Sequence, residues 1–231
     1  MSLRAILFDA GNTLLRMNYA DIASALAAHG VDTTADAVQR AEWAARVRLD
    51  ADVLAHAAST ETRSTHERYL RYVLAGVGVS DEPTVRAVEA WRHGYNRPIG
   101  LWNTADPAAV AALDAVREAG LRSAVVSNSN GTIRSLLTRL GLAERIDAVV
   151  DSGEEGVEKP NRRIFEVALA RVEAKAEEAA YIGDLYSIDV LGARVAGLAA
   201  VLLDPGGCWG TRDCETAPDV LAAVRRLLAR R

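Results

Sequence analysis

Short runs of apolar residues recur along the chain, and each run ends at a polar residue or a glycine. The runs are rich in valine and isoleucine, and they do not alternate apolar with polar positions. Such runs are typical of strands that are buried on both faces, as in a parallel sheet. They lie at residues 5–8, 123–126, 148–150, 180–182 and 200–203.

Segments with helical signals separate most of these runs. The segment 106–120 begins with Asp106 and Pro107 and ends at Gly120, which are typical helix-boundary residues. Further helices are expected at 131–140, 161–174 and 187–196. Strands that alternate with helices indicate βαβ units, so we predict an α/β fold: a Rossmann-like parallel sheet with helices on both faces.

The stretch that follows the first strand has a different pattern. It is rich in alanine and contains no clear strand-like apolar run. Helices are expected there at 19–29, 35–57, 65–75 and 84–95. We therefore expect two domains: an α/β core of residues 1–15 and 98–231, and an all-helical insertion of residues 16–97.

Composition narrows the class of protein. The 231 residues are 50% hydrophobic and 25% charged, which is ordinary for a globular protein. A net charge of −4, with basic and acidic residues mixed along the chain, argues against a nucleic-acid-binding protein. No apolar run approaches the roughly 18 residues of a membrane helix, and the first residues lack a signal-peptide pattern. We therefore expect no membrane association and, by default, a cytoplasmic location.

Polar residues and glycines follow several of the predicted strands. In parallel α/β proteins, ligands bind at the edge of the sheet formed by the carboxyl ends of the strands. The candidate set after the first strand consists of Asp9, Gly11, Asn12 and Thr13. Ser127 and Asn128 follow the second strand, Asp184 and Asp189 follow a later one, and Lys159 lies in a loop that opens a helix.

These residue types suit a phosphate group held beside a divalent metal ion. A carboxylate such as Asp9 can attack phosphorus and form an aspartyl-phosphate, which divides one difficult step into two. Mg²⁺ prefers hard oxygen ligands, and Asp9 and Asp184 can supply them. Lys159 and the hydroxyl of Ser127 can stabilise charge on the phosphate oxygens in the transition state.

Four short motifs, taken in order, resemble those of the haloacid dehalogenase (HAD) superfamily of hydrolases. They are FDAGNTL at 8–14, VSN at 126–128, GVEKP at 156–160 and GDLYSID at 183–189. Each motif alone is a weak signal, whereas four in this order at strand ends and helix starts are specific. The resemblance covers nearly all of the chain, and the helical insertion resembles the C1-type cap of the family.

The resemblance implies a Mg²⁺-dependent phosphatase that acts on a small phosphorylated metabolite. It implies that Asp9 is the nucleophile and a metal ligand, that Gly11 offers its backbone carbonyl to the metal, and that Asp184 is the second carboxylate ligand. Asp189 would be a further metal ligand, or it would orient its neighbours. The residues implied to bind phosphate or substrate are Ser127, Asn128 and Lys159.

Gly11 departs from the family pattern, which usually has an aspartate two residues after the nucleophile as general acid and base. One alternative is a 2-haloacid dehalogenase, in which Asp9 attacks carbon, although Gly183 and Asp184 fit a metal site better. Another is a weakly active or silent HAD fold used for binding. Phosphonate-cleaving relatives use a cap lysine as a Schiff base, but the only lysines, Lys159 and Lys175, lie outside the insertion.

Overall fold

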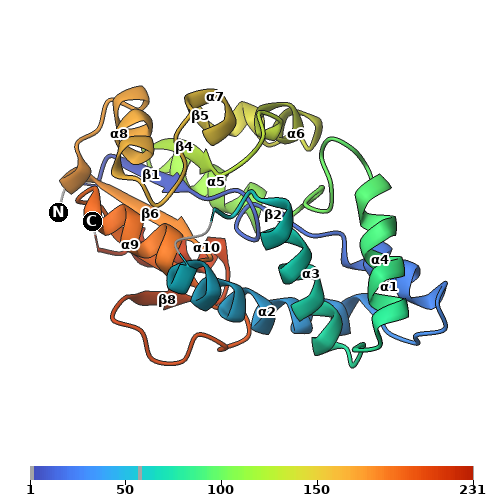
Figure 1. The fold of residues 1–231 in the computed structure, drawn as a ribbon. Helices are drawn as coiled ribbons and strands as arrows, with labels where there is room; N and C mark the ends of the chain where they lie inside the picture. Colours follow the sequence, from blue (N-terminus) through green and yellow to red (C-terminus); the bar gives the residue numbers. More distant parts are fainter. Residues whose placement is uncertain (1–2, 57–58, 231) are drawn as a thin grey trace. The chain divides into compact units, whose positions relative to one another are not determined.

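The structure is a computed structural model that describes residues 3–56 and 59–230. The α/β unit contains a six-stranded parallel sheet with strand order β5–β4–β1–β6–β7–β8 (Figure 1). Its strands are β1 (Ala5–Phe8), β4 (Arg122–Ser127), β5 (Ala148–Asp151), β6 (Ala179–Gly183), β7 (Ala199–Leu203) and β8 (Glu215–Ala217). The predicted α/β class with a parallel sheet is confirmed, and β8 is an addition that its short polar sequence does not predict.

The register of the central strands brings distant parts of the chain together. β1 lies between β4 and β6, and its last residue, Phe8, is paired with Val125 and Ile182. Because the three strands are parallel, their carboxyl ends meet at one edge of the sheet. The loops that begin after Phe8, Ser127 and Gly183 are therefore neighbours.

The helices of this unit are shorter than the sequence pattern predicts, and α7 and α10 are additional. They are α5 (Ala109–Glu118), α6 (Ile133–Arg139), α7 (Ser152–Glu155), α8 (Arg162–Arg171), α9 (Leu191–Val195) and α10 (Val220–Leu228). Two short 3₁₀ turns, η1 (Ala143–Arg145) and η2 (Ala176–Glu178), and a π turn, η3 (Tyr186–Val190), complete the list.

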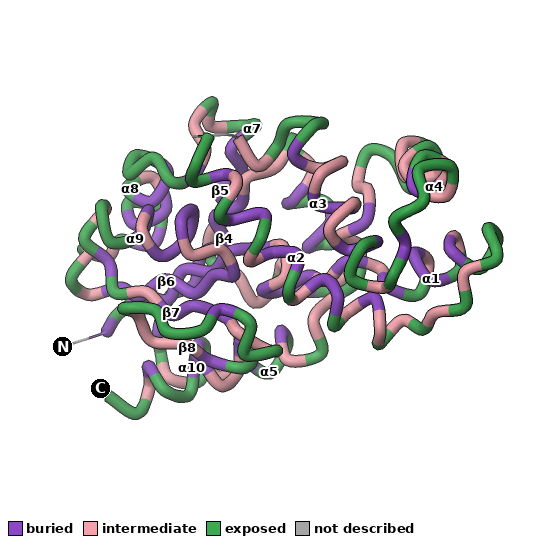
Figure 2. The backbone as a smooth tube through the Cα atoms, turned by 60° about the horizontal axis from the view of Figure 1, so that its bottom comes forward, coloured by how far each residue is buried: buried purple, intermediate pink, exposed green. Residues whose placement is uncertain are grey.

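Two helix pairs cover the sheet. α8 and α9 pack on one face, where Leu7, Val126 and Tyr181 share a buried cluster with Phe165. α5 and α10 contact each other and strands β4, β6 and β7, and their described residues are outside that cluster. The central strands β1, β4 and β6 are consequently buried almost throughout, as Figure 2 shows for β4 and β6.

A helical insertion separates β1 from β4 in the chain. It consists of α1 (Tyr19–Ala27), α2 (Ala35–His56), α3 (Arg63–Gly76) and α4 (Glu82–Gly94), close to their predicted bounds. The predicted end of α2 at Ala57 lies outside the described residues. Met17–Asn103 forms one compact unit, and Met1–Arg16 with Thr104–Arg231 forms the other. The predicted insertion of helices after the first strand is confirmed.

The insertion has a buried charged group at its centre. Glu42 is fully buried and accepts hydrogen bonds from Arg46 at 2.9 and 2.6 Å, from the hydroxyl of Tyr19 at 2.9 Å, and from the hydroxyl of Tyr69. A buried carboxylate is tolerated when it is paired and hydrogen-bonded in this way. The contacts fix α1, α2 and α3 against one another. None of the described helices combines the length and the apolar composition needed to cross a membrane.

A two-stranded antiparallel ribbon marks the points where the chain leaves and re-enters the α/β unit. β2 (Leu15–Arg16) pairs with β3 (Thr104–Ala105). Beside the ribbon, Arg16 Nε donates to Asp106 Oδ2 at 2.6 Å. Strands of two residues leave no periodic pattern in the sequence, so this ribbon is not predictable from hydrophobicity.

Candidate active site

The ammonium group of Lys159 lies among three oxygen atoms at the carboxyl edge of the sheet. It donates to Asp9 Oδ1 at 2.5 Å, to Asp189 Oδ1 at 2.7 Å and to the hydroxyl of Tyr181 at 2.9 Å. The side chains of Lys159, Asp189 and Asp9 are 2%, 1% and 10% exposed. Because an unpaired buried charge is very costly, these close contacts between the ammonium group and the two carboxyl groups offset the cost of their burial.

The backbone of Lys159 is held by Asn128 at the end of β4. Asn128 Oδ1 accepts from the N–H of Lys159 at 2.7 Å, and Asn128 Nδ2 donates to the carbonyl of Lys159 at 3.0 Å. Two residues later Asn161 caps α8, since its side chain accepts from the N–H of Arg163 at 3.0 Å. Lys159 is therefore held on one side by Asn128 and on the other by the start of α8.

Asp189 connects Lys159 to the loop after β6. While its Oδ1 accepts from the ammonium, its Oδ2 accepts from the backbone N–H groups of Asp184 at 3.1 Å and Leu185 at 2.9 Å. A β-carbon on Gly183 would lie 2.4 Å from Cγ of Asp189. This close approach requires glycine at position 183, and the π turn η3 returns the chain so that Asp189 faces the strand end.

Three buried carboxylates form the best candidate metal site in the described part of the chain. Oxygen atoms of Asp9, Asp184 and Asp189 lie within 4.8 Å of one another. One ammonium group cannot balance three carboxylates, so a divalent cation fits the charge of the site, and Mg²⁺ prefers such oxygen ligands. Because both oxygens of Asp189 already accept hydrogen bonds from the protein, Asp9 and Asp184 are the better-placed ligands.

The electrostatics of the cluster follow from burial and from the close charges. Burial raises the pKa of the Asp9 carboxyl, and the neighbouring Lys159 opposes this effect. For Lys159, burial favours the neutral amine, but the charges of Asp189 and Asp9 and the hydrogen bonds to them raise its pKa above the ordinary value. The lysine therefore stays protonated, and a cation beside Asp9 would favour the ionised carboxylate.

The turn after β1 contains the predicted residue Gly11. The N–H groups of Leu14 and Leu15 both donate to the carbonyl of Ala10, at 3.0 and 2.8 Å, which makes the turn tight. Asn12 has a φ of +54°, in the left-handed region, and its Nδ2 donates to Asp184 Oδ2 at 3.1 Å. The turn thus links β1 to the loop after β6 through the predicted residue Asn12.

The loop after β4 is fixed by the end of β5. Ser127 is buried, and its Oγ donates to the carbonyl of Asn128 at 3.3 Å. Asp151, which is fully buried, accepts from the N–H of Gly131 at 3.0 Å and from the hydroxyl of Ser129 at 2.6 Å. The residues that follow Ser127, the last residue of β4, are therefore held in place by the end of β5.

The structure brings most of the predicted residues together. Asp9, Lys159 and Asp189 are in direct contact, and a backbone hydrogen bond joins Asp189 to Asp184. Asn128 contacts Lys159 through the backbone. Gly11 lies in the turn after β1, and Ser127 is the last residue of β4, at the same edge of the sheet. The roles of all these residues toward metal and substrate stay predictions.

The sequence pattern does not indicate one polar residue of the site, Tyr181. Tyr181 lies within an apolar strand run, where an aromatic residue is normally part of the core. A signal for Tyr181 was present, however, because a buried tyrosine hydroxyl needs a hydrogen-bond partner and the strand ends two residues later at Gly183.

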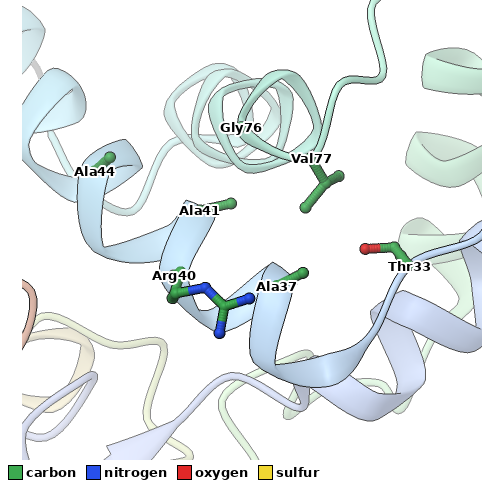
Figure 3. A pocket seen from close by; sticks show the side chains of 7 residues that line it. All are labelled: Thr33, Ala37, Arg40, Ala41, Ala44, Gly76 and Val77. Atoms are coloured by element: carbon green, nitrogen blue, oxygen red, sulfur yellow. The ribbon is translucent and has the colours of Figure 1, made fainter.

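A separate pocket lies inside the insertion, between α2 and the end of α3 (Figure 3). Its lining is mostly small and apolar, with Arg40 as the one charged residue, and consists of Thr33, Ala37, Arg40, Ala41, Ala44, Gly76 and Val77. Its lining includes no carboxylate, histidine or cysteine. This pocket therefore lacks the carboxyl groups that surround the ammonium of Lys159, which belong to Asp9 and Asp189.

Comparison with known proteins finds relatives that are similar in sequence and solved structures that are similar in fold. The chain is 33% identical over 212 residues to a ribulose-1,5-bisphosphate 5-phosphatase of Halopiger xanaduensis, covering 87% of this chain and 84% of the relative. It is 36% identical over 156 residues to a phosphoserine phosphatase of Thermus thermophilus, covering 67% and 59%. Among solved structures, a putative HAD-hydrolase YfnB of Bacillus subtilis bound to magnesium has a TM-score of 0.65 at 16% identity, covering 98% and 99%.

The family assignment follows from the extent of the match rather than from any one motif. The family model described as haloacid dehalogenase-like hydrolase matches residues 3–197. That range includes the site residues Asp9, Lys159, Tyr181, Asp184 and Asp189. With most of its length matched by that model, this chain belongs to the haloacid dehalogenase-like hydrolase family.

Proposed function

We propose that this protein is a Mg²⁺-dependent phosphatase that hydrolyses a small phosphorylated metabolite through an aspartyl-phosphate on Asp9. The observation that supports this most is the 2.5 Å contact between Asp9 Oδ1 and the buried ammonium of Lys159, beside two further carboxylates. A nucleophilic carboxylate next to a fixed cation and a divalent-metal site is the arrangement that phosphoryl transfer needs.

The residues divide into metal-binding and positioning groups. Asp9 and Asp184 would hold Mg²⁺ together with the backbone carbonyl of Gly11. The ion would supply charge neutralisation for the phosphate oxygens. Asp189 would act mainly as a positioning residue, since its oxygens are bonded to Lys159 and to the N–H of Asp184.

Lys159 and Ser127 would stabilise the transferred phosphoryl group. When Asp9 attacks phosphorus, an O–P bond forms, the bond to the leaving oxygen breaks, and negative charge passes from the carboxylate to the phosphoryl oxygens and leaving group. The ammonium beside Asp9 is placed to interact with that charge as it develops. Water then hydrolyses the acyl-phosphate and restores Asp9.

The relatives suggest the size and chemistry of the substrate. Relatives that are named for an activity are phosphatases of ribulose-1,5-bisphosphate, phosphoserine and glyceraldehyde 3-phosphate. All three are small metabolites that carry a phosphate ester. We therefore place the substrate in the class of small phosphate monoesters of hydroxylated metabolites.

The test is hydrolysis of a panel of phosphorylated metabolites and of a phenyl phosphate, with Mg²⁺ and with excess chelator. We expect Mg²⁺-dependent release of phosphate, and we expect Asp9→Asn to reduce it at least a thousandfold, since it removes the nucleophile. Asp219→Asn is the matched control, because Asp219 caps α10 and asparagine caps a helix equally well.

Other outcomes would replace the proposal. Full activity of Asp9→Asn would exclude the aspartyl-phosphate mechanism. Chelator-insensitive halide release from a 2-haloacid would identify a dehalogenase instead. No turnover of any substrate, with Mg²⁺ bound, would favour a binding role for the fold.

A further inference from the structure

The hydroxyl of Tyr181 joins three separate segments of the candidate site. It accepts from Lys159 Nζ at 2.9 Å, and it lies 3.1 Å from Asp189 Oδ1 and 3.2 Å from the carbonyl of Val126. Tyr181 is in β6 and Val126 is in β4, so the side chain passes the end of β1, which separates those two strands (Figure 1). One buried oxygen therefore contacts the β4 end, the lysine loop and the π turn.

The hydroxyl oxygen of Tyr181 completes the hydrogen bonds of the Lys159 ammonium. An ammonium group has three N–H donors, and here one points to Asp9, one to Asp189 and one to Tyr181. Without the hydroxyl, one donor would remain unsatisfied in a site where the lysine side chain is 2% exposed. The ammonium would then move to find another acceptor, because an unmade hydrogen bond of a buried charge is costly.

We propose that Tyr181 is a positioning residue that holds the Lys159 ammonium against Asp9, so that loss of its hydroxyl impairs the chemical step. This inference rests on the proposed function. Phosphoryl transfer depends on a cation that is already in place when charge leaves Asp9. Tyr181 contributes through the geometry of Lys159, and it does not contact phosphate itself.

A purely structural role for Tyr181 makes a different prediction. Its ring packs edge-on against Phe165, with centroids 5.1 Å apart and planes at 75°. If the tyrosine only filled the core, Tyr181→Phe would keep this packing and would leave catalysis unchanged. Phe165→Leu is the matched control, because it disturbs the ring contact and leaves the hydroxyl network intact.

The kinetic arm compares Tyr181→Phe, Phe165→Leu and the unaltered protein on the phosphorylated substrate. We expect Tyr181→Phe to lower kcat about tenfold with KM changed less than about twofold, since the lost interaction acts mainly in the transition state. We expect Phe165→Leu to lower the unfolding midpoint while its folded fraction keeps the original kcat. If Tyr181→Phe does not fold, Tyr181→Met replaces it, because the flexible methionine fills the space without a hydroxyl.

A second arm observes Lys159 without any turnover. The chain has only two lysines, so a nitrogen–proton NMR spectrum of the lysine ammonium groups contains signals from Lys159 and from the exposed Lys175. We expect the Lys159 ammonium protons to exchange slowly with water in the unaltered protein. In Tyr181→Phe their exchange should accelerate about tenfold, while the Lys175 signal stays unchanged as an internal control.

The two arms separate failure of this inference from failure of the proposed function. If the unaltered protein hydrolyses phosphate esters, but Tyr181→Phe changes neither kcat nor Lys159 exchange, the inference is wrong and the function stands. A fall in kcat without a change at Lys159, or the reverse, also overturns it. If the unaltered protein has no phosphatase activity, the proposed function fails, and the catalytic part of the inference fails with it even where the NMR shows that Tyr181 positions Lys159.

Discussion

The side-chain amide of Asn128 bonds to the backbone of Lys159 in both directions. Its oxygen accepts from the N–H of Lys159 at 2.7 Å, and its nitrogen donates to the carbonyl of Lys159 at 3.0 Å. This double contact ties the end of β4 to the loop that precedes α8. The contact between the ammonium of Lys159 and Asp9 depends on the position of the Lys159 backbone as well as on its side chain.

Asn128→Asp tests this contact with a nearly isosteric change. The oxygen that replaces Nδ2 would face the carbonyl of Lys159 at about the same distance, so a hydrogen bond becomes a repulsion. We expect a loss of about 1–3 kcal/mol in the free energy of unfolding and a fall in kcat/KM of tenfold or more. Urea unfolding and steady-state kinetics measure the two effects.

Asn161→Asp is the matched control for that variant. It makes the same chemical change near Lys159, but Asn161 only accepts from the N–H of Arg163 at the start of α8. Aspartate serves equally well as a helix N-cap, so we expect stability and kcat/KM close to the original. Equal effects of the two substitutions would show that added negative charge, rather than the lost donor, is responsible.

Gly11→Asp addresses the missing general acid. An aspartate two residues after the nucleophile can protonate the leaving group and later activate water, which is worth about 10²–10⁴-fold in rate. We expect Gly11→Asp to raise kcat on simple phosphate monoesters at least tenfold. The gain should be larger for leaving groups of high pKa, which need protonation more, and a series of substituted phenyl phosphates measures this.

The kinetics of Gly11→Asp also show whether another residue of the site already performs the acid–base step. A uniform gain across the series would indicate that the new side chain improves binding and does not transfer a proton. No gain at all would mean that another residue already performs the acid–base step. Gly206→Asp, in the loop after β7, adds the same charge outside the predicted motifs and serves as the control.

Much of the candidate site is predictable because parallel strands have one carboxyl edge. Asp9, Ser127 and Asp184 each follow an apolar run, and the sheet order places those runs side by side. Lys159 is predictable only from its motif, since it follows no strand. Its side chain reaches the cluster because Asn128 and α8 hold its backbone, and no local sequence pattern encodes that long-range contact.

Other features depend on tertiary contacts that leave no periodic signal. The helix predicted at 187–196 is observed as a π turn followed by α9, since Asp189 bonds to the backbone of Asp184 and Leu185. Glycine at position 183 permits that arrangement through a close approach that sequence alone does not reveal. Tyr181 could not be predicted for a related reason. Within an apolar run, the sequence does not distinguish a tyrosine that only packs in the core from one whose hydroxyl makes hydrogen bonds in the site.

The packing of α2 against α3 depends on a missing side chain. A β-carbon on Gly76 would lie 2.7 Å from Cβ of Ala41. Alanine is favoured over glycine in helices by up to about 1 kcal/mol, but overpacking costs about 1–3 kcal/mol. We expect Gly76→Ala to destabilise the protein by about 1 kcal/mol or more, measured by urea unfolding.

Gly94→Ala is the matched control for that prediction. Gly94 also ends a helix of the insertion, α4, and a β-carbon there would meet nothing within 4 Å. Helix propensity then acts alone, so we expect a neutral or slightly stabilising effect. Stabilisation by both substitutions would show that α2 and α3 separate easily at Gly76.

His66 makes the insertion sensitive to acid. Burial and the nearby charge of Arg92 lower the pKa of His66 from 6.5 to about 4, although the carbonyl of Thr60 accepts a hydrogen bond from its ring. Glu61 lies 4.0 Å away and Trp102 packs beside the ring. Burial and the charge of Arg92 leave the imidazole neutral in the folded protein at pH values where the unfolded chain is already protonated.

The direction of the pH effect follows from proton uptake. Between pH 6.5 and about 4 the unfolded state binds the proton and the folded state does not, so stability falls as pH falls through this window. Above pH 6.5 both states are neutral, and the effect vanishes. The full difference corresponds to about 2–3 kcal/mol for a side chain that is mostly buried.

His66→Gln isolates this contribution from those of all other titrating groups. We expect the free energy of unfolding of the unaltered protein to fall by about 2–3 kcal/mol relative to His66→Gln between pH 7 and pH 4. Denaturation followed by tryptophan fluorescence measures it, since Trp102 lies beside the ring. Curves of His66→Gln and the unaltered protein that stay parallel at every pH would show that the buried imidazole accepts a proton as readily in the folded protein as in the unfolded chain.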